Sequence, residues 1–70
     1  GIRCLDLHGV RHDNVEIELI DFCYKYQKQI PLKIICGNSK KMIDICTKSL
    51  GNHGINYDFQ RYGIIMVVKI

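Results

Sequence analysis

Titratable side chains gather in one short stretch of the chain, residues 4–13 (CLDLHGVRHD). Asp6 and His8 lie two positions apart in it, so both point to the same face if the stretch is a strand. A carboxylate beside an imidazole can work as an acid–base pair or hold a divalent cation such as Mg²⁺. An aspartate at a strand end can equally be structural, accepting backbone N–H bonds from the next loop. Both roles of Asp6 stay open.

A second polar cluster, residues 37–41 (GNSKK), follows the next apolar segment. Lys40 and Lys41 fall in the first turn of a predicted helix, where the partial positive charge disfavours cations. Helix starts with glycine and free N–H groups bind anions, so two lysines placed there favour a phosphate ligand. The alternative is that both lysines simply point into solvent.

The elements that position these residues follow from apolar spacing. Residues 3–7 (RCLDL) predict a short strand, and a helix follows with Asp13 or Asn14 as its expected N-cap. Its apolar stripe has helical spacing and consists of Val15, Leu19, Phe22, Cys23 and Tyr26. The first half of this helix is strongly acidic.

The middle of the chain repeats the strand–helix order. Pro31 can only open a strand, and the largely apolar residues 32–36 (LKIIC) follow it. A second helix comes next, with Asn38 or Ser39 as the expected N-cap. Its apolar stripe consists of Met42, Ile43, Cys46 and Leu50.

Two strands are predicted after Gly51 or Gly54 ends the second helix. Residues 55–60 (INYDFQ) alternate, as a half-buried strand does. The side chains expected on its apolar face are Ile55, Tyr57 and Phe59. Residues 61–63 (RYG) form a turn, and residues 64–70 (IIMVVKI) form the last strand.

The order β-α-β-α-β-β predicts one α/β domain over residues 1–70, a two-layer sandwich with a four-stranded mixed sheet and both helices on one face. The first two strands should be parallel, joined by a right-handed crossover, and the last two an antiparallel hairpin. The loops after the two parallel strands should then meet at one edge of the sheet, the usual place for a ligand.

Composition limits the function classes. The net charge of +3 permits contact with phosphate or an acidic surface but demands neither. No apolar run reaches the roughly 20 residues of a membrane span, so no membrane partner is expected. The start of the chain lacks a signal-peptide pattern, and its opening at Gly1 instead of Met leaves open that the chain is a module of a larger parent protein or has a protein partner.

Four cysteines at positions 4, 23, 36 and 46 contain no C-x-x-C pair and fall on apolar positions of their elements. This pattern favours reduced core thiols in a cytoplasmic compartment over a disulfide framework or a metal site. We therefore expect no metal ligands among them.

Residues 5–9 (LDLHG), followed by a helix, resemble the signature of the small MutS-related (Smr) domain. The apolar strand running into a glycine loop at residues 34–39 (IICGNS) and the closing strand at residues 63–70 (GIIMVVKI) match that family's plan. The resemblance covers essentially the whole chain. It implies a fold similar to the C-terminal domain of bacterial translation initiation factor three, and members that bind nucleic acid, several of which nick DNA or cleave RNA.

The family's functional residues map onto this sequence in two places. Its acid and imidazole fall on Asp6 and His8 as catalytic residues, with Gly9 as the motif glycine. Its second motif, a His or Thr followed by G-x-G, falls on residues 36–39, where Cys36 takes the His or Thr place and Ser39 replaces the second glycine. A thiol substitutes poorly for an imidazole or hydroxyl at a phosphate, so this departure affects cleavage more than binding.

The sequence thus favours a nucleic-acid-binding Smr-like domain, with endonuclease activity left open. Besides the Asp6–His8 pair, the expected contacts to nucleic acid are Gly9, Arg11, His12, Gly37, Asn38, Ser39, Lys40, Lys41, Arg61 and Tyr62. Tyr62 either stacks on an unpaired base or caps the sheet. The alternative function is a catalytically degenerate module for protein interaction, and a zinc or redox site at Cys36 and His8 is a third.

Overall fold

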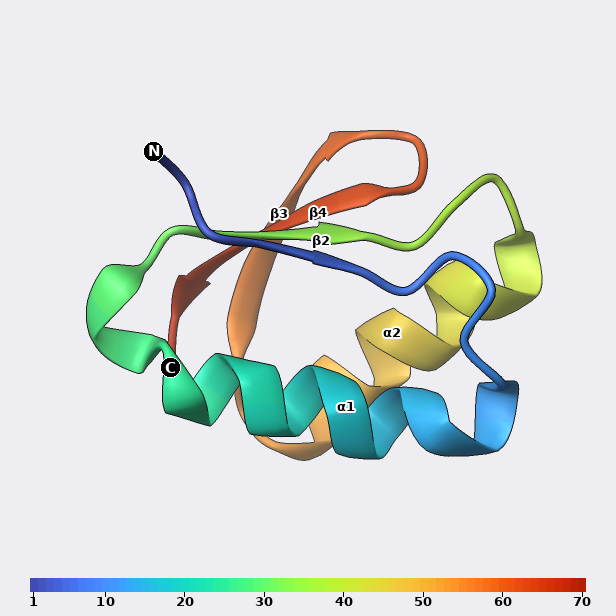
Figure 1. Ribbon diagram of the computed structural model, residues 1–70, viewed down its shortest axis with the longest axis horizontal. Helices are drawn as coiled ribbons and strands as arrows, with labels where there is room; N and C mark the ends of the chain where they lie inside the picture. The colour runs from blue at the N-terminus through green and yellow to red at the C-terminus, as the bar shows by residue number, and fades with distance from the viewer.

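Strands and helices alternate along the chain in the predicted order (Figure 1). The computed structural model describes the whole chain, residues 1–70. The elements are β1 (Cys4–Asp6), α1 (His12–Lys25), a short 3₁₀ helix η1 (Gln27–Gln29), β2 (Leu32–Ile35), α2 (Lys40–Asn52), β3 (Asn56–Arg61) and β4 (Ile64–Lys69). Neither α1 nor α2 combines the length and apolar content that a membrane-spanning helix needs.

The four strands form one mixed sheet in the order β1-β2-β4-β3. β1 and β2 are parallel, whereas β4 is antiparallel to both β2 and β3. Both helices lie on one side of this sheet, below it in the view of Figure 1. The predicted two-layer α/β sandwich is confirmed, with the last two strands as a hairpin.

The core lies between the sheet and the helices because each element turns one apolar side inward. All four predicted stripe residues of α2 are buried, and so are Val15, Leu19, Phe22 and Cys23 of α1. The sheet contributes alternate residues, among them Ile34 and Ile65, which are paired across β2 and β4. Burying a Leu or Ile side chain contributes about 1.5–3 kcal/mol, so these contacts hold the helices on the sheet.

The two helices begin differently. Ser39 caps α2 as predicted, its hydroxyl accepting a hydrogen bond from the Met42 N–H at 3.2 Å. α1 begins at His12, so the prediction of Asp13 or Asn14 as N-cap is wrong. Arg11 occupies the cap position in an extended conformation and makes no side-chain cap bond. The helix starts early because the N–H of Asn14 already bonds to the carbonyl oxygen of Arg11.

Two expected core residues lie at the edges of the sheet and are exposed. Phe59 shares a face with Tyr57, their ring centroids 5.8 Å apart, but it is 54 % exposed because β3 is an edge strand with no helix beyond it. Cys4 is exposed because it pairs with Lys33 on the side of the sheet that the helices leave free. The other three cysteines are buried, and none of the four forms a disulfide bond.

The side of the sheet opposite the helices, called here the open face, is not covered by any element (Figure 1). Paired residues of neighbouring strands share a face, so the register identifies its members. They include two rows: Cys4, Lys33, Met66 and Asp58, and Asp6, Ile35, Ile64 and Arg61. The second row lies at the end of the sheet where the loops after β1 and β2 meet.

Candidate functional site

A cleft of about 580 Å³ lies at this end of the open face. Three connections meet around it: the loop after β1, the loop after β2, and the turn between β3 and β4, all on the right of Figure 1. The residues that line it are Asp6, His8, Ile35, Gly37, Asn38, Arg61, Tyr62, Gly63 and Ile64. Here it is called the open-face cleft.

Asp6 and His8 reach the cleft because β1 ends in a tight turn. One carboxylate oxygen of Asp6 accepts a hydrogen bond from the backbone N–H of His8 at 2.9 Å. The N–H of Leu7 bonds to the carbonyl oxygen of Ile35 at 2.8 Å, which holds the turn against β2. Gly9 continues the turn with a φ of 85°. The structural role foreseen for Asp6 is therefore present, and the carboxylate remains exposed.

The wall of the cleft is built from two glycines that approach each other closely. The N–H of Cys36 donates to the carbonyl oxygen of Gly63 at 2.8 Å. A methyl group on Gly63 would collide with the carbonyl group of Gly37, so only glycine fits there. A methyl group on Gly37 would lie 3.8 Å from the His8 imidazole, which places that ring beside the second loop.

The third side of the cleft comes from the β3–β4 turn. Arg61 pairs with Ile64, and the two residues between them, Tyr62 and Gly63, make the turn with a φ of 80° at the glycine. Arg61 takes part in none of the chain's ion pairs, so its charge is free for a ligand. Tyr62 is 63 % exposed, hence it does not serve as a cap over the sheet.

Sequence reasoning missed three residues of this cleft, Ile35, Gly63 and Ile64. The two-residue turn at Tyr62 and Gly63 sets Ile64 beside Arg61 and was a local signal for Gly63 and Ile64. The alignment of β4 with β2 joins residues far apart in sequence and has no such signal. Knowing that alignment would have placed Ile35 and Ile64 side by side under the two loops.

Six of the predicted contact residues do not line the cleft. They are Gly9, Arg11, His12, Ser39, Lys40 and Lys41. Two of them have partners elsewhere: the Nε of Arg11 lies 3.7 Å from Asp13, and Lys40 donates to Asp44 at 3.1 Å. The cations expected to meet a phosphate at the start of α2 are thus not at the open-face cleft.

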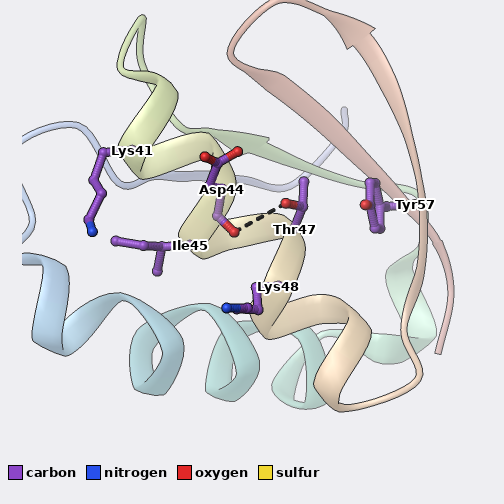
Figure 2. A pocket seen from close by; sticks show the side chains of 6 residues that line it. All are labelled: Lys41, Asp44, Ile45, Thr47, Lys48 and Tyr57. Atoms are coloured by element: carbon purple, nitrogen blue, oxygen red, sulfur yellow. Dashed lines mark hydrogen bonds between the residues drawn. The ribbon is translucent and has the colours of Figure 1, made fainter.

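Lys41 lines a different cleft, between α2 and β3, together with Ile45, Lys48 and Tyr57 (Figure 2). Asp44 and Thr47 complete it, the Thr47 hydroxyl donating to the backbone carbonyl of Asp44 at 3.2 Å. This cleft is on the helical side of the molecule, whereas Asp6 and His8 are on the open face.

Cys36, at the place of the family's His or Thr, points away from the cleft into the core. It is 2 % exposed and forms a hydrogen bond with the buried thiol of Cys46. Cys46 donates to Cys36, and this bond lowers the pKa of Cys36 while it raises the pKa of Cys46 together with burial. Neither sulfur can reach a ligand in the cleft.

A divalent cation would find few protein ligands here. The cleft offers one carboxylate and one imidazole, and the chain contains no group of three or more His, Cys, Asp or Glu side chains that could hold a metal ion. A cation bound at Asp6 would have to take most of its ligands from water or from a bound phosphate.

Comparison with known proteins finds no matching family model, no matching curated relative and no matching solved structure.

Proposed function

We propose that this chain is a nucleic-acid-binding domain of the Smr type and that it binds through the open-face cleft. The observation that carries the proposal is the meeting of three connections, which brings the unpaired cation Arg61, the exposed ring of Tyr62 and the imidazole of His8 to one concave site. A cation beside a stacking surface is the combination that single-stranded nucleic acid uses.

The distribution of charge along the chain also favours binding at the open face. Four of the seven acidic residues lie on α1, namely Asp13, Glu16, Glu18 and Asp21. All but one of the ten lysines and arginines lie elsewhere in the chain. Because α1 lies on the side away from the open face, its acids repel a polyanion from that helix. The other lysines of the two α-helices, Lys40, Lys41 and Lys48, are confined to α2.

Binding is better supported than cleavage. Cys36 is buried against Cys46, so the second motif contributes no side chain to the cleft from that position. One oxygen of Asp6 is already engaged by the His8 N–H. A phosphodiester could be held here by Arg61, whereas a water nucleophile would depend on Asp6 and His8 alone. We therefore propose binding without strand scission.

The test is the binding of labelled single-stranded and duplex oligonucleotides, measured by fluorescence anisotropy between about 50 and 200 mM salt. Affinity should fall with salt, and Arg61→Gln should weaken binding several-fold and reduce the slope of log K against log salt by about 0.7. Lys28→Gln is the matched control, because Lys28 lies on η1 at the opposite end of the molecule, and it should leave the slope unchanged.

Three results would contradict the proposal: affinity independent of salt, equal effects of Arg61→Gln and Lys28→Gln, or no binding. A protein that binds no oligonucleotide would favour the protein-interaction alternative. Strand scission by the wild type that Asp6→Ala and His8→Ala abolish, in the presence or absence of Mg²⁺, would show that the cleft is catalytic.

A further inference from the structure

One row of four side chains crosses the open face beneath the cleft. Asp6 pairs with Ile35, Ile35 with Ile64, and Ile64 with Arg61, so the row runs from one edge strand to the other. A register shift leaves Gln60 without a partner and sets Arg61 opposite Ile64. The row therefore carries a carboxylate at one end, a guanidinium at the other and two isoleucines between them.

The two charged ends do not satisfy each other. Neighbouring strands are about 4.8 Å apart, so three spacings separate the backbones of Asp6 and Arg61 by roughly 14 Å. No ion pair joins them. Asp6 has one oxygen free of protein partners, and its bonded oxygen can accept a second hydrogen bond. Both ends therefore remain available to one ligand lying across the isoleucines.

The ligand that fits this row has a defined chemistry. It must offer hydrogen-bond donors at one end, a flat apolar surface in the middle and an anion at the other end. A cleft of about 580 Å³ has the size of a small-molecule site and not of a duplex groove. A single nucleotide has these three parts, namely the edge of its base, the face of its base and its phosphate.

We propose that the open-face cleft reads one unpaired base, with the base lying on Ile35 and Ile64, its edge donating to Asp6 and its phosphate meeting Arg61. This inference rests on the proposed nucleic-acid binding and assigns Asp6 to recognition. Guanine should be preferred, because its Watson–Crick edge carries two adjacent donors and an ionised carboxylate has only acceptors. Uracil and thymine, whose single donor is flanked by two carbonyl oxygens, should be disfavoured.

The base must be unpaired for this contact, because pairing occupies the edge that Asp6 would read. Loops, ends and single strands are therefore the expected substrates, as is usual for sequence-specific RNA recognition. Tyr62, exposed at the rim of the cleft, offers its ring to the neighbouring base.

The experiment compares three short single strands that differ at one central position: an all-uridine strand, one with guanosine, and one with inosine, which lacks the second donor. The wild type should bind the guanosine strand about five- to a hundredfold more tightly than the uridine strand, with inosine between them. The same set in DNA, with thymidine as the background, shows whether the ribose contributes.

Asp6→Asn is the deciding variant, since its amide oxygen can still accept the His8 N–H while its NH₂ group replaces an acceptor with donors. The guanosine preference should fall to within about twofold. Asp58→Asn removes the same charge from the same face in the neighbouring row and should leave the preference intact.

The outcomes separate this inference from the proposed function. Three results would overturn base recognition by Asp6 while leaving nucleic-acid binding in place. They are equal affinity for all three strands, a guanosine preference that survives Asp6→Asn, and a guanosine preference that Asp58→Asn also removes. Failure to bind any strand would overturn both. Should Asp6→Asn fail to fold, as judged by circular dichroism, equal binding of guanosine and inosine strands by the wild type still overturns it.

Discussion

Gly63 is the residue at which one added methyl group would disturb the site most. Its φ of 80° is strained for any other residue, and the position a methyl group would take is occupied by the backbone of Gly37. Gly54 has a comparable φ of 67° but open space around it. An alanine at Gly54 therefore measures the free-energy cost of the left-handed backbone alone, whereas an alanine at Gly63 adds the cost of the close contact.

Gly54→Ala should reduce the free energy of unfolding by about 1–2 kcal/mol, the strain of a left-handed conformation. Gly63→Ala should cost a further ~1–3 kcal/mol, because backbone atoms must move to admit the methyl group. Urea denaturation of both variants checks this. Equal losses would mean that the approach of the β3–β4 turn to the second loop is not tight.

The four cysteines should differ in reactivity, because only Cys4 is exposed. In the native protein a thiol reagent should label Cys4 rapidly, while Cys23, Cys36 and Cys46 react only after unfolding. Mass spectrometry after timed labelling, with and without denaturant, counts the modified residues. Cys4→Ser serves as the control and should remove the fast phase; a fast phase that persists would show that a second thiol is accessible.

At the scale of elements, the start of α2 is capped and the start of α1 is not. Sequence reasoning located both helices and their apolar stripes, because 3.6-residue periodicity is a property of the helix itself. It placed the α1 boundary two to three residues late, because Asp13 and Asn14 are strong capping residues and nothing local shows that the chain turns at Arg11.

Ser39→Ala should therefore reduce the free energy of unfolding by about 1 kcal/mol, since it leaves the Met42 N–H without its partner. Arg11→Ser should increase it by up to about 1 kcal/mol, because it supplies the missing cap and loses only an exposed ion pair. Urea midpoints measure both changes. Neither residue lines the open-face cleft, so both variants should bind oligonucleotides with unchanged affinity. Weaker binding by Ser39→Ala would show that the start of α2 belongs to the binding site.

For the whole molecule, the order of elements determined the fold but not the membership of the site. Alternating apolar segments predicted the sandwich, and the parallel pair correctly brought the first two loops together. The position of β4 between β2 and β3 depends on pairings between residues far apart in sequence, and no local pattern encodes them. For that reason Ile35 and Ile64 were missed. Lys40 and Lys41 were expected at the cleft because they follow the second loop, but they lie on α2 and do not line it.

The packed core makes stability sensitive to alkaline pH. Burial raises the pKa of Cys23 from 9.0 to about 11, so between these values the unfolded chain has released a proton that the folded chain retains. Stability must then fall as pH rises through this window, by about 2–3 kcal/mol in total for this thiol. Denaturation measured between about pH 8.5 and about pH 11 should show a smaller fall in stability for Cys23→Ala than for the wild type. Parallel curves for the two proteins would exclude this origin.

The two edge strands of the sheet, β1 and β3, affect how readily the protein aggregates in crowded solutions. β1 is three residues long, and β3, the longer edge, has register shifts at both ends of its ladder. Short or irregular edges are poor templates for strands of another molecule. The protein can thus leave one whole side of its sheet uncovered for a ligand without offering a continuous row of free backbone groups to fibril growth.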